Sequence, residues 1–253
     1  MLKFNDKINS FSYKGISSAD MGMFVMDKQN IYGAATPVIE TVNIPARGNL
    51  IIDNKADTLD NETFNDYEIT YKCCIDIEAD MDIYDVARRI YKWLYTDIAY
   101  EKLYDTYEPD CYREAYVKGA ASVSELAGKI LGSFDIVFTV RAYKKTLQGT
   151  KVLTITQKET EIYNPEGFTS SPYIKIYGTG DIILYINSRS HSFKDVDEYI
   201  EIDSGLMNAY KGQQLQNNKM LTAVFPKLVS GKNNISWLGN VSKLEITPRW
   251  CRL

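Results

Sequence analysis

The clearest pattern in the chain is a strict alternation of apolar and polar residues between Tyr67 and Glu78. A period of two places alternate side chains on opposite faces of a strand, so the pattern predicts a strand with one buried face and one wet face. The alternation returns between Phe134 and Val140 and predicts a second strand of the same layer. The apolar residues are Tyr67, Ile69, Tyr71, Cys73, Ile75 and Ile77 in the first strand, and Phe134, Ile136, Phe138 and Val140 in the second.

Between these two strands the apolar period lengthens and predicts one helix, from about Ile83 to Tyr95. Asp82 is the expected N-cap, and Asp85 places a carboxylate near the positive end of the helix. Met81 is expected to pack on Val86 as a hydrophobic staple. The apolar stripe is Ile83, Ala87, Ile90, Leu94 and Tyr91, and the solvated face carries Arg88, Arg89 and Lys92.

The beginning of the chain predicts a β-hairpin. The segment Phe11 to Gly15 is typical of a strand that enters a turn, and Met23 to Met26 is the expected returning strand. Between them, Asp20-Met21-Gly22 predicts a second turn, in which Gly22 is a candidate structural residue.

A short polar segment from Tyr143 to Thr150 is the expected boundary between two β-rich domains, residues 1–145 and 146–253. The second domain is predicted to consist of short strands separated by glycine and proline turns. The expected strands are Lys151 to Gln157, Tyr173 to Tyr177, Asp181 to Asn187, Glu198 to Ile202, Ile235 to Leu238 and Ser242 to Thr247. The expected turns are Pro165-Glu166-Gly167, Gly178-Thr179-Gly180 and Asp203-Ser204-Gly205.

The closing segment from Val224 to Leu253 has the order of elements expected for the last part of a β-sandwich. Pro226 is expected to stop a strand, and Gly231 to supply a turn in which Asn233 bonds the local backbone. A final strand is expected to end at Pro248-Arg249-Trp250, where Trp250 caps a core. Asp203 is interpreted as a turn former rather than an acid catalyst.

Composition narrows the possible functions. The chain of 253 residues carries a net charge of −4, so it lacks the clustered positive charge that grips a phosphate backbone, and we expect no sequence-specific nucleic-acid binding. No apolar run approaches a membrane span or a signal-peptide core, so we expect no membrane insertion and synthesis in the cytosol. The four cysteines lack zinc-site spacing and are expected to be free thiols: Cys73, Cys74, Cys111 and Cys251.

The sequence also argues against catalysis. It contains a single histidine, His191, and no nucleophile elbow, phosphate-binding glycine loop or paired-histidine metal motif. A pair of carboxylates of the kind used by glycosidases stays open, because any two of the 33 acidic residues could converge in space. We therefore expect no catalytic residue, cofactor or metal site.

The order of motifs in the second half resembles the distal tail protein (Dit) family of long-tailed bacteriophages. The opening Gly15-Ile16-Ser17-Ser18 and Asp20 to Val25 are also similar to the start of that family. The motifs of the second half are Asn164-Pro165, Ser171-Pro172, Gly178-Thr179-Gly180, Ile202-Asp203, Tyr210, Phe225-Pro226, Gly231-x-Asn233-x-Ile235 and Pro248-Arg249-Trp250.

The resemblance implies an N-terminal β-sandwich with a helix that builds a ring and a C-terminal galectin-like β-sandwich. It also implies a structural hub at the virion tail tip: a homo-hexameric ring with a central channel for DNA. The implied partners are the major tail-tube protein, the tail-associated lysin or tail-tip protein, and receptor-binding or baseplate proteins. The chain is too short for the inserted carbohydrate-binding domain of longer members.

An alternative function is a carbohydrate-binding module that recognises the host surface. Asn187, Arg189, His191 and Trp237 are of the types that sugar sites use for hydrogen bonds and stacking. Their order departs from the galectin signature, because Asn187 precedes His191 and no Glu follows Trp237 until Glu245. Sugar binding by these residues is thus the second hypothesis.

Overall fold

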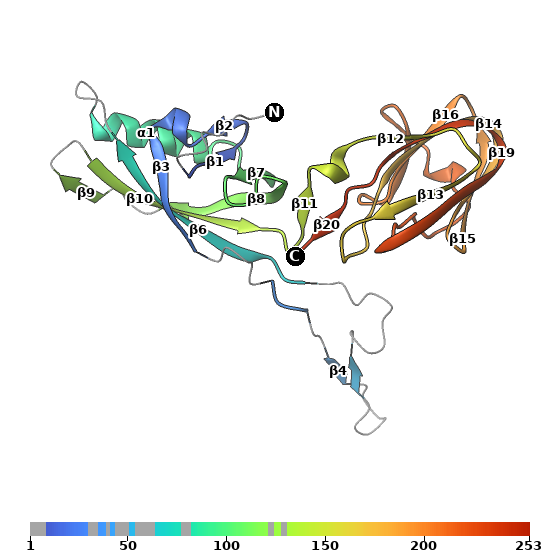
Figure 1. Cartoon of the computed structure of the whole chain (residues 1–253), viewed down its shortest axis with the longest axis horizontal. Coiled ribbons are helices and arrows are strands. Elements are labelled where there is room, and N and C mark those ends of the chain that lie inside the picture. The colour runs from blue at the N-terminus through green and yellow to red at the C-terminus, as the bar shows by residue number, and fades with distance from the viewer. Residues whose placement is uncertain are drawn as a thin grey trace. The chain divides into compact units, whose positions relative to one another are not determined.

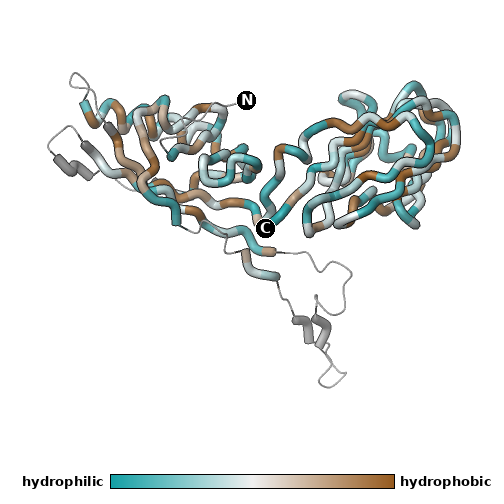
Figure 2. The backbone as a smooth tube through the Cα atoms, viewed as in Figure 1, coloured by the Kyte–Doolittle hydropathy of each residue, from teal (hydrophilic) through white to brown (hydrophobic). Residues whose placement is uncertain are grey.

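The computed structural model describes residues 9–29, 35–38, 41–43, 51–53, 64–76, 82–120, 124–127 and 131–253. The chain divides into two compact units, residues 1–144 with Leu253 and residues 145–252. Both units are built mainly from β-strands, and the described residues contain one α-helix, as the alternation of the sequence predicts (Figure 1). Hydrophobic residues alternate with hydrophilic ones along the strands of both units (Figure 2).

The first unit contains an antiparallel sheet with the strand order β2-β1-β7-β8-β10-β6-β3, and β9 pairs with the beginning of β10. A separate two-stranded sheet is formed by β4 and β5. The strands are β1 (Phe11–Tyr13), β2 (Ile16–Ser17), β3 (Met23–Gln29), β4 (Thr41–Asn43), β5 (Ile51–Asp53), β6 (Tyr67–Asp76), β7 (Glu101–Asp105), β8 (Cys111–Ala120), β9 (Ser124–Ala127) and β10 (Leu131–Val140).

Strand β6 confirms the alternation seen in the sequence. Tyr67, Ile69, Tyr71, Cys73 and Ile75 are all buried, and β6 pairs in unbroken register with β10 from Tyr67↔Val140 to Asp76↔Leu131. The last two residues of the predicted strand, Ile77 and Glu78, lie outside the described residues. The two strands predicted to share a layer are therefore direct neighbours.

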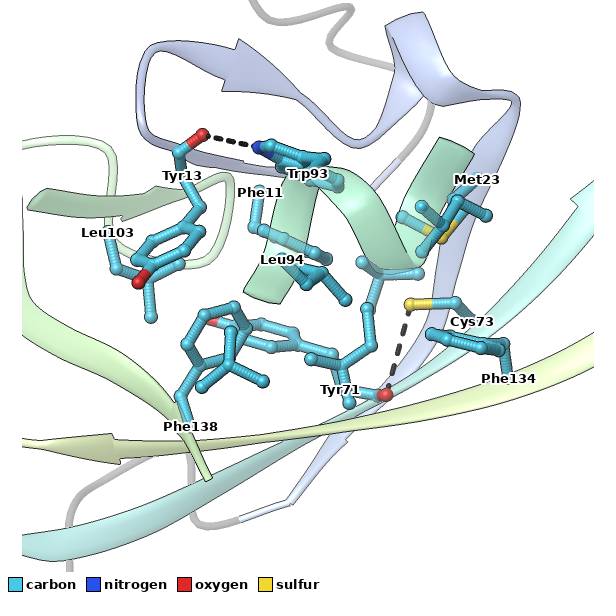
Figure 3. Packing of buried hydrophobic residues seen from close by; sticks show 14 of the residues in the cluster. Phe11, Tyr13, Met23, Tyr71, Cys73, Trp93, Leu94, Leu103, Phe134 and Phe138 are labelled. Carbon is cyan, nitrogen blue, oxygen red and sulfur yellow. Dashed lines mark hydrogen bonds between the residues drawn. The ribbon is translucent and has the colours of Figure 1, made fainter. Parts of the chain in front are cut away.

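The helix α1 (Ile83–Tyr95) has the predicted bounds, and Asp82 is its N-cap, since its carboxylate accepts a hydrogen bond from the Tyr84 backbone amide. Its apolar face packs on the inner face of the sheet (Figures 1 and 3). Trp93 fixes this contact, because its indole Nε1 donates to the Tyr13 carbonyl at 3.0 Å. The expected staple residue Met81 lies outside the described residues. The helix residues in the core are Ile83, Val86, Ile90, Trp93 and Leu94.

The second unit is organised around two long neighbouring strands, β14 (Tyr173–Ile186) and β19 (Gly231–Thr247). Each is paired along its whole length, but with different partners at its two ends. One half of the sheet has the order β12-β19-β14-β16-β17-β18 and the other has β13-β19-β14-β15. The remaining strands are β12 (Leu153–Ile155), β13 (Glu159–Asn164), β15 (Arg189–Val196), β16 (Tyr199–Asp203), β17 (Asn208–Lys211) and β18 (Gln214–Leu215).

Glycines allow β14 and β19 to pass from one half of the sheet to the other. The register between them shifts at Tyr177/Gly178 and again between Thr179 and Ile183. A Cβ on Gly178 would lie 2.3 Å from the Asn240 carbonyl oxygen, and one on Gly239, where φ is +102°, would lie 2.4 Å from the Asp181 carbonyl oxygen. Only glycine permits backbones to approach this closely. We call this region, residues 178–180 and 239, the glycine corner.

The glycine corner corrects two expectations from the sequence. Gly178-Thr179-Gly180 is not a turn between two strands but a bulged bend inside β14, and Ile235 to Leu238 and Ser242 to Thr247 form one strand, β19. Glycine in a strand can mark a bulge as well as a chain reversal, and only the pairing of the neighbouring strand distinguishes them.

Two further expectations for the closing segment were wrong. The residues before Pro226 do not form a strand, and the first pairing after it is an isolated bridge between Leu228 and Ser170. The final short strand, β20 (Cys251–Arg252), follows Trp250 rather than ending at it. It pairs with β11 (Lys144–Thr146), and the Thr146 amide donates to the Trp250 carbonyl at 2.9 Å.

Candidate functional site

A cluster of buried charges lies inside the first unit, centred on Asp105 at the end of β7. The Asp105 carboxylate accepts hydrogen bonds from Lys28 Nζ and from the Tyr71 hydroxyl, each at 2.6 Å, and from Arg113 Nη1 at 3.4 Å. Its second oxygen accepts from the backbone amides of Tyr107 and Glu108, each at 3.0 Å. The side chains of Lys28 and Asp105 are fully buried.

A β-bulge in β3 places Lys28 in this cluster. The register between β3 and β6 shifts between Val25 and Asp27, so Met26 is the extra residue and the side chains beyond it change face. Lys28 therefore points inward opposite Tyr71. Strands β3 and β7 are separated by β8, β10 and β6, so the 2.6 Å contact between Lys28 and Asp105 requires the sheet to curl around its inner face.

The cluster continues through Arg113 on β8. Its guanidinium pairs with Glu108, and Glu108 also accepts from Lys144 Nζ at 2.9 Å. Burial lowers the pKa of Lys28, and the attraction of Asp105 compensates only in part. Burial also acts against ionisation of Asp105, but Lys28 and Arg113 outweigh it and hold the pKa of Asp105 below its ordinary value. The side chains of the cluster are bonded to one another, so they link β3, β6, β7 and β8 from inside the sheet.

In the second unit, Asp203 and Arg249 form the strongest polar contact of the closing segment. Arg249 Nη1 and Nη2 donate to the two carboxylate oxygens of Asp203 at 2.7 and 2.8 Å. Asp203 also accepts from the amides of Gly205 and Leu206, at 2.9 and 3.0 Å. These bonds outweigh burial and lower the pKa of Asp203. Asp203 thus ends β16 and holds the predicted turn that follows it, and it also anchors the Pro248-Arg249-Trp250 motif, which the sequence did not indicate.

The other candidate structural residues also occupy turns, strand ends or the core. Gly22 ends a short 3₁₀ turn with φ of +74°, and Gly231 begins β19 with φ of +81°. Pro226 is buried, and so is Pro248, whose carbonyl accepts from Ser170 Oγ at 2.8 Å. Trp250 is buried in the core of the second unit. Their assignment as structural residues of the family motif stays a prediction.

Asn233 is fully buried and has all its amide groups bonded. Its Nδ2 donates to the carbonyls of Val229 and Gly231, at 2.8 and 3.0 Å, and its Oδ1 accepts from the Val229 amide at 2.9 Å. Oδ1 also accepts from Asn187 Nδ2 at 3.1 Å, while Asn187 Oδ1 accepts from the Asn234 amide at 2.9 Å. Asn187 adopts φ of +55° in the turn between β14 and β15. Both asparagines are therefore engaged in holding the ends of strands.

The four candidate sugar contacts do not form a common exposed site. Trp237 is only 5% exposed and belongs to the core. His191 is also buried, its Nδ1 lies 2.9 Å from the Val224 carbonyl, and burial lowers its pKa. Trp237 and His191 flank Leu184 on neighbouring strands, so the structure brings them together inside the fold. Arg189 and Asn187 are exposed, and the Asn187 side chain is bonded to the Asn234 amide and to Asn233.

A half-exposed face of alternating tyrosine and charged residues lies on β14, β16 and β19 of the second unit. Lys175 lies opposite both Glu201 on β16 and Glu245 on β19, and its Nζ is 3.9 Å from the ring centre of Tyr199. Tyr177 donates to Glu245 at 2.9 Å and carries Lys243 over its ring at 4.2 Å. Because lysines lie over the tyrosine rings, these rings are less open to the stacking of a sugar. We call this surface the tyrosine–lysine face.

Among the described residues, no group of three or more His, Cys, Asp or Glu side chains could hold a metal ion. No helix in the described part of the chain is long and apolar enough to cross a membrane.

Comparison with known proteins shows that both the sequence and the fold are similar to those of phage tail proteins. Residues 50–140 match the family model of the phage tail protein RIFT-related domain, a segment that includes β6, α1, β8 and β10. The structure is similar to the crystal structure of the Dit protein (gp 19.1) of phage SPP1, with a TM-score of 0.69 and 12% identity over 97% of this chain and 100% of that chain. The chain has the fold of a distal tail protein.

Two structures of the phage p2 baseplate in its activated conformation, one with Sr and one with Ca, are also similar. Each has a TM-score of 0.50 and 10% identity, over 94% of this chain and 97% of that chain. No curated protein matches the sequence. The resemblance to distal tail proteins and the mainly β, two-part fold that it implied are confirmed. The SPP1 protein is described as a paradigm of the hub adsorption apparatus of phages that infect Gram-positive bacteria.

Proposed function

We propose that this protein is the structural hub of a phage tail tip. The observation that carries the proposal is the match to the SPP1 Dit protein over 97% of this chain and the whole of that chain. The family match of residues 50–140 supports it independently, because it identifies the first unit as a phage tail domain from sequence. The hub is located in the virion and assembles in the bacterial cytoplasm.

In this proposal the N-terminal domain, residues 1–145, builds a ring of six copies. A ring requires a repeated head-to-tail interface whose rotation divides a full turn. The charge cluster around Asp105 supports this role, since it ties β3, β6, β7 and β8 together from inside and gives the subunit a stiff frame. The net charge of −4 per chain gives a ring about −24 in total, so a channel lined by part of that charge repels DNA in passage.

The C-terminal domain, residues 146–253, is the proposed platform for receptor-binding or baseplate proteins, while the two faces of the ring meet the tail-tube protein and the tail-associated lysin. The tyrosine–lysine face supports the platform role. Its side chains are held by one another, so little conformational entropy is lost when a partner covers them.

Multi-angle light scattering and negative-stain electron microscopy of the purified protein test the hub. We expect a ring of about 173 kDa, six times the 28.9 kDa chain, alone or with the tail-tip partner. A strictly monomeric protein at every concentration, alone and with that partner, contradicts the proposal.

The sugar hypothesis is tested separately by glycan-array binding of wild type and Arg189→Ala. Trp237→Ala is unsuitable for that purpose, because Trp237 belongs to the core.

A further inference from the structure

The second unit has one edge strand whose outer side is unprotected. Strand β13 (Glu159–Asn164) pairs with β19 over six consecutive residues without a register shift. Its sequence, Glu-Thr-Glu-Ile-Tyr-Asn, contains neither proline nor glycine. Within the described residues the only strand that pairs with β13 is β19, so the opposite edge of β13 presents free backbone groups.

Several other sheet edges of the described residues are short or blocked, as soluble proteins usually arrange them. In the first unit, β3 carries the bulge at Met26 and the inward charge of Lys28, and β2 has two residues. In the second unit, β12 and β18 have three and two residues. Strand β15 is covered by the segment that follows β18, because the Leu221 amide donates to the Ser192 carbonyl at 2.8 Å.

The side chains of β13 define what could pair with it. Glu159, Glu161 and Tyr163 point to the solvent, and Tyr163 is 64% exposed, while Ile162 points into the core. The strand carries two carboxylates and no basic residue, and Lys232 on β19 already pairs with Glu161 at 3.2 Å. A neighbouring strand therefore meets two carboxylates on one of its faces, and on the other it meets Ile162 between Thr160 and Asn164.

We propose that β13 is a strand-addition site for an extended segment of another protein in which basic and apolar residues alternate. The basic side chains lie beside Glu159 and Glu161, the apolar ones extend the core beside Ile162, and the free backbone groups of β13 complete the ladder. A second copy of β13 does not fit this description, because it would bring carboxylates towards carboxylates. This inference does not depend on the hub assignment.

The test uses the full-length protein and a blocked synthetic heptapeptide of alternating lysine and valine. Hydrogen exchange with mass spectrometry should show new protection of residues 159–164, and calorimetry should show saturable binding. Two control peptides should not bind: one with glutamate in place of lysine, and the lysine peptide N-methylated at every residue, which cannot donate backbone hydrogen bonds.

Matched variants separate the site from general charge attraction. The double variant Glu159→Lys with Glu161→Lys should weaken binding at least about tenfold, since two attractive pairs become repulsive. The control Asp197→Lys with Glu198→Lys makes the same change of net charge at an exposed turn and should leave the affinity within about twofold. Equal weakening by both pairs, protection outside β13, or protection of β13 that rises with protein concentration without peptide would overturn the proposal.

Discussion

Replacing Asp105 by asparagine tests whether the buried charge cluster holds the first unit together. The change keeps the size of the side chain but removes the charge that balances Lys28 and Arg113. One of the two oxygen positions becomes an amide nitrogen, which is a donor. It faces either the donors Lys28 and Tyr71 or the backbone amides of Tyr107 and Glu108, so one set of hydrogen bonds is lost. Removing one member of a buried ion pair typically lowers the free energy of unfolding by about 3–5 kcal/mol. The full loss is expected for Asp105→Asn, because the Asp105 side chain is fully buried and water does not screen its charge.

The exposed pair between Arg88 and Asp85 supplies the matched control. These side chains are 79% and 62% exposed, so Asp85→Asn should cost less than about 1 kcal/mol. Native-state hydrogen exchange in urea, with peptides from β6 and β10 compared with peptides from β14 and β19, assigns the loss to one unit. The reasoning is refuted if the two variants lose equal stability, or if the loss for Asp105→Asn appears mainly in the second unit.

The difference in stability between wild type and Asp105→Asn should depend on pH. The pKa of Asp105 is lowered in the folded state, as is that of Glu108, so the cluster stabilises the protein above the unfolded carboxyl pKa of about 4. That stability disappears as the pH falls through the folded pKa values. The difference in unfolding free energy between wild type and Asp105→Asn should therefore be largest near pH 7 and shrink below about pH 4. A constant difference from pH 7 to pH 3 contradicts this account.

Three further predictions concern the second unit. Gly239→Ala should lower the free energy of unfolding by at least about 2 kcal/mol, because it places a Cβ against backbone at positive φ. The control Gly167→Ala, whose Cβ would lie in open space, should lower it little. Urea denaturation compares the two variants, and equal midpoints would contradict the close approach at Gly239. Burial lowers the pKa of His191, so the free energy of unfolding should fall as the pH drops below about 6.5 towards the folded pKa. His191→Gln should remove that pH dependence. An ordinary pKa in an NMR titration of this single histidine would contradict the prediction. Trp237→Ala should lower the unfolding free energy by about 3–5 kcal/mol, and a thermal midpoint equal to that of wild type would show that Trp237 is not a core residue.

Local periodicity was enough to predict the elements that depend on local interactions. The helix and its Asp82 cap follow from neighbours in sequence, and β6 follows from its alternation. The glycine corner was misread because a bend inside a strand and a turn between strands have the same local composition. The difference lies in the pairing of β14 with β19, which are about sixty residues apart in the chain.

The polar sites depend on contacts between distant residues and were harder to find. The buried position of Lys28 was not predicted, because the bulge that turns it inward leaves no clear mark in the sequence. Arg249 was already part of a recognised motif, yet nothing in the sequence paired it with Asp203. Burial of two sugar candidates was also hidden, since residue type alone does not show that Trp237 and His191 face the core.

The glycine corner determines how the second unit can come apart. Because β14 and β19 run through both halves of the sheet, the halves share two backbones that are paired with each other, besides the short links 156–158 and 197–198. Opening one half strips hydrogen bonds from strands that the other half also needs, so the unit should unfold as a single cooperative block. A partner that exerts force on β13 or β15 is therefore resisted by the hydrogen bonds of the whole unit.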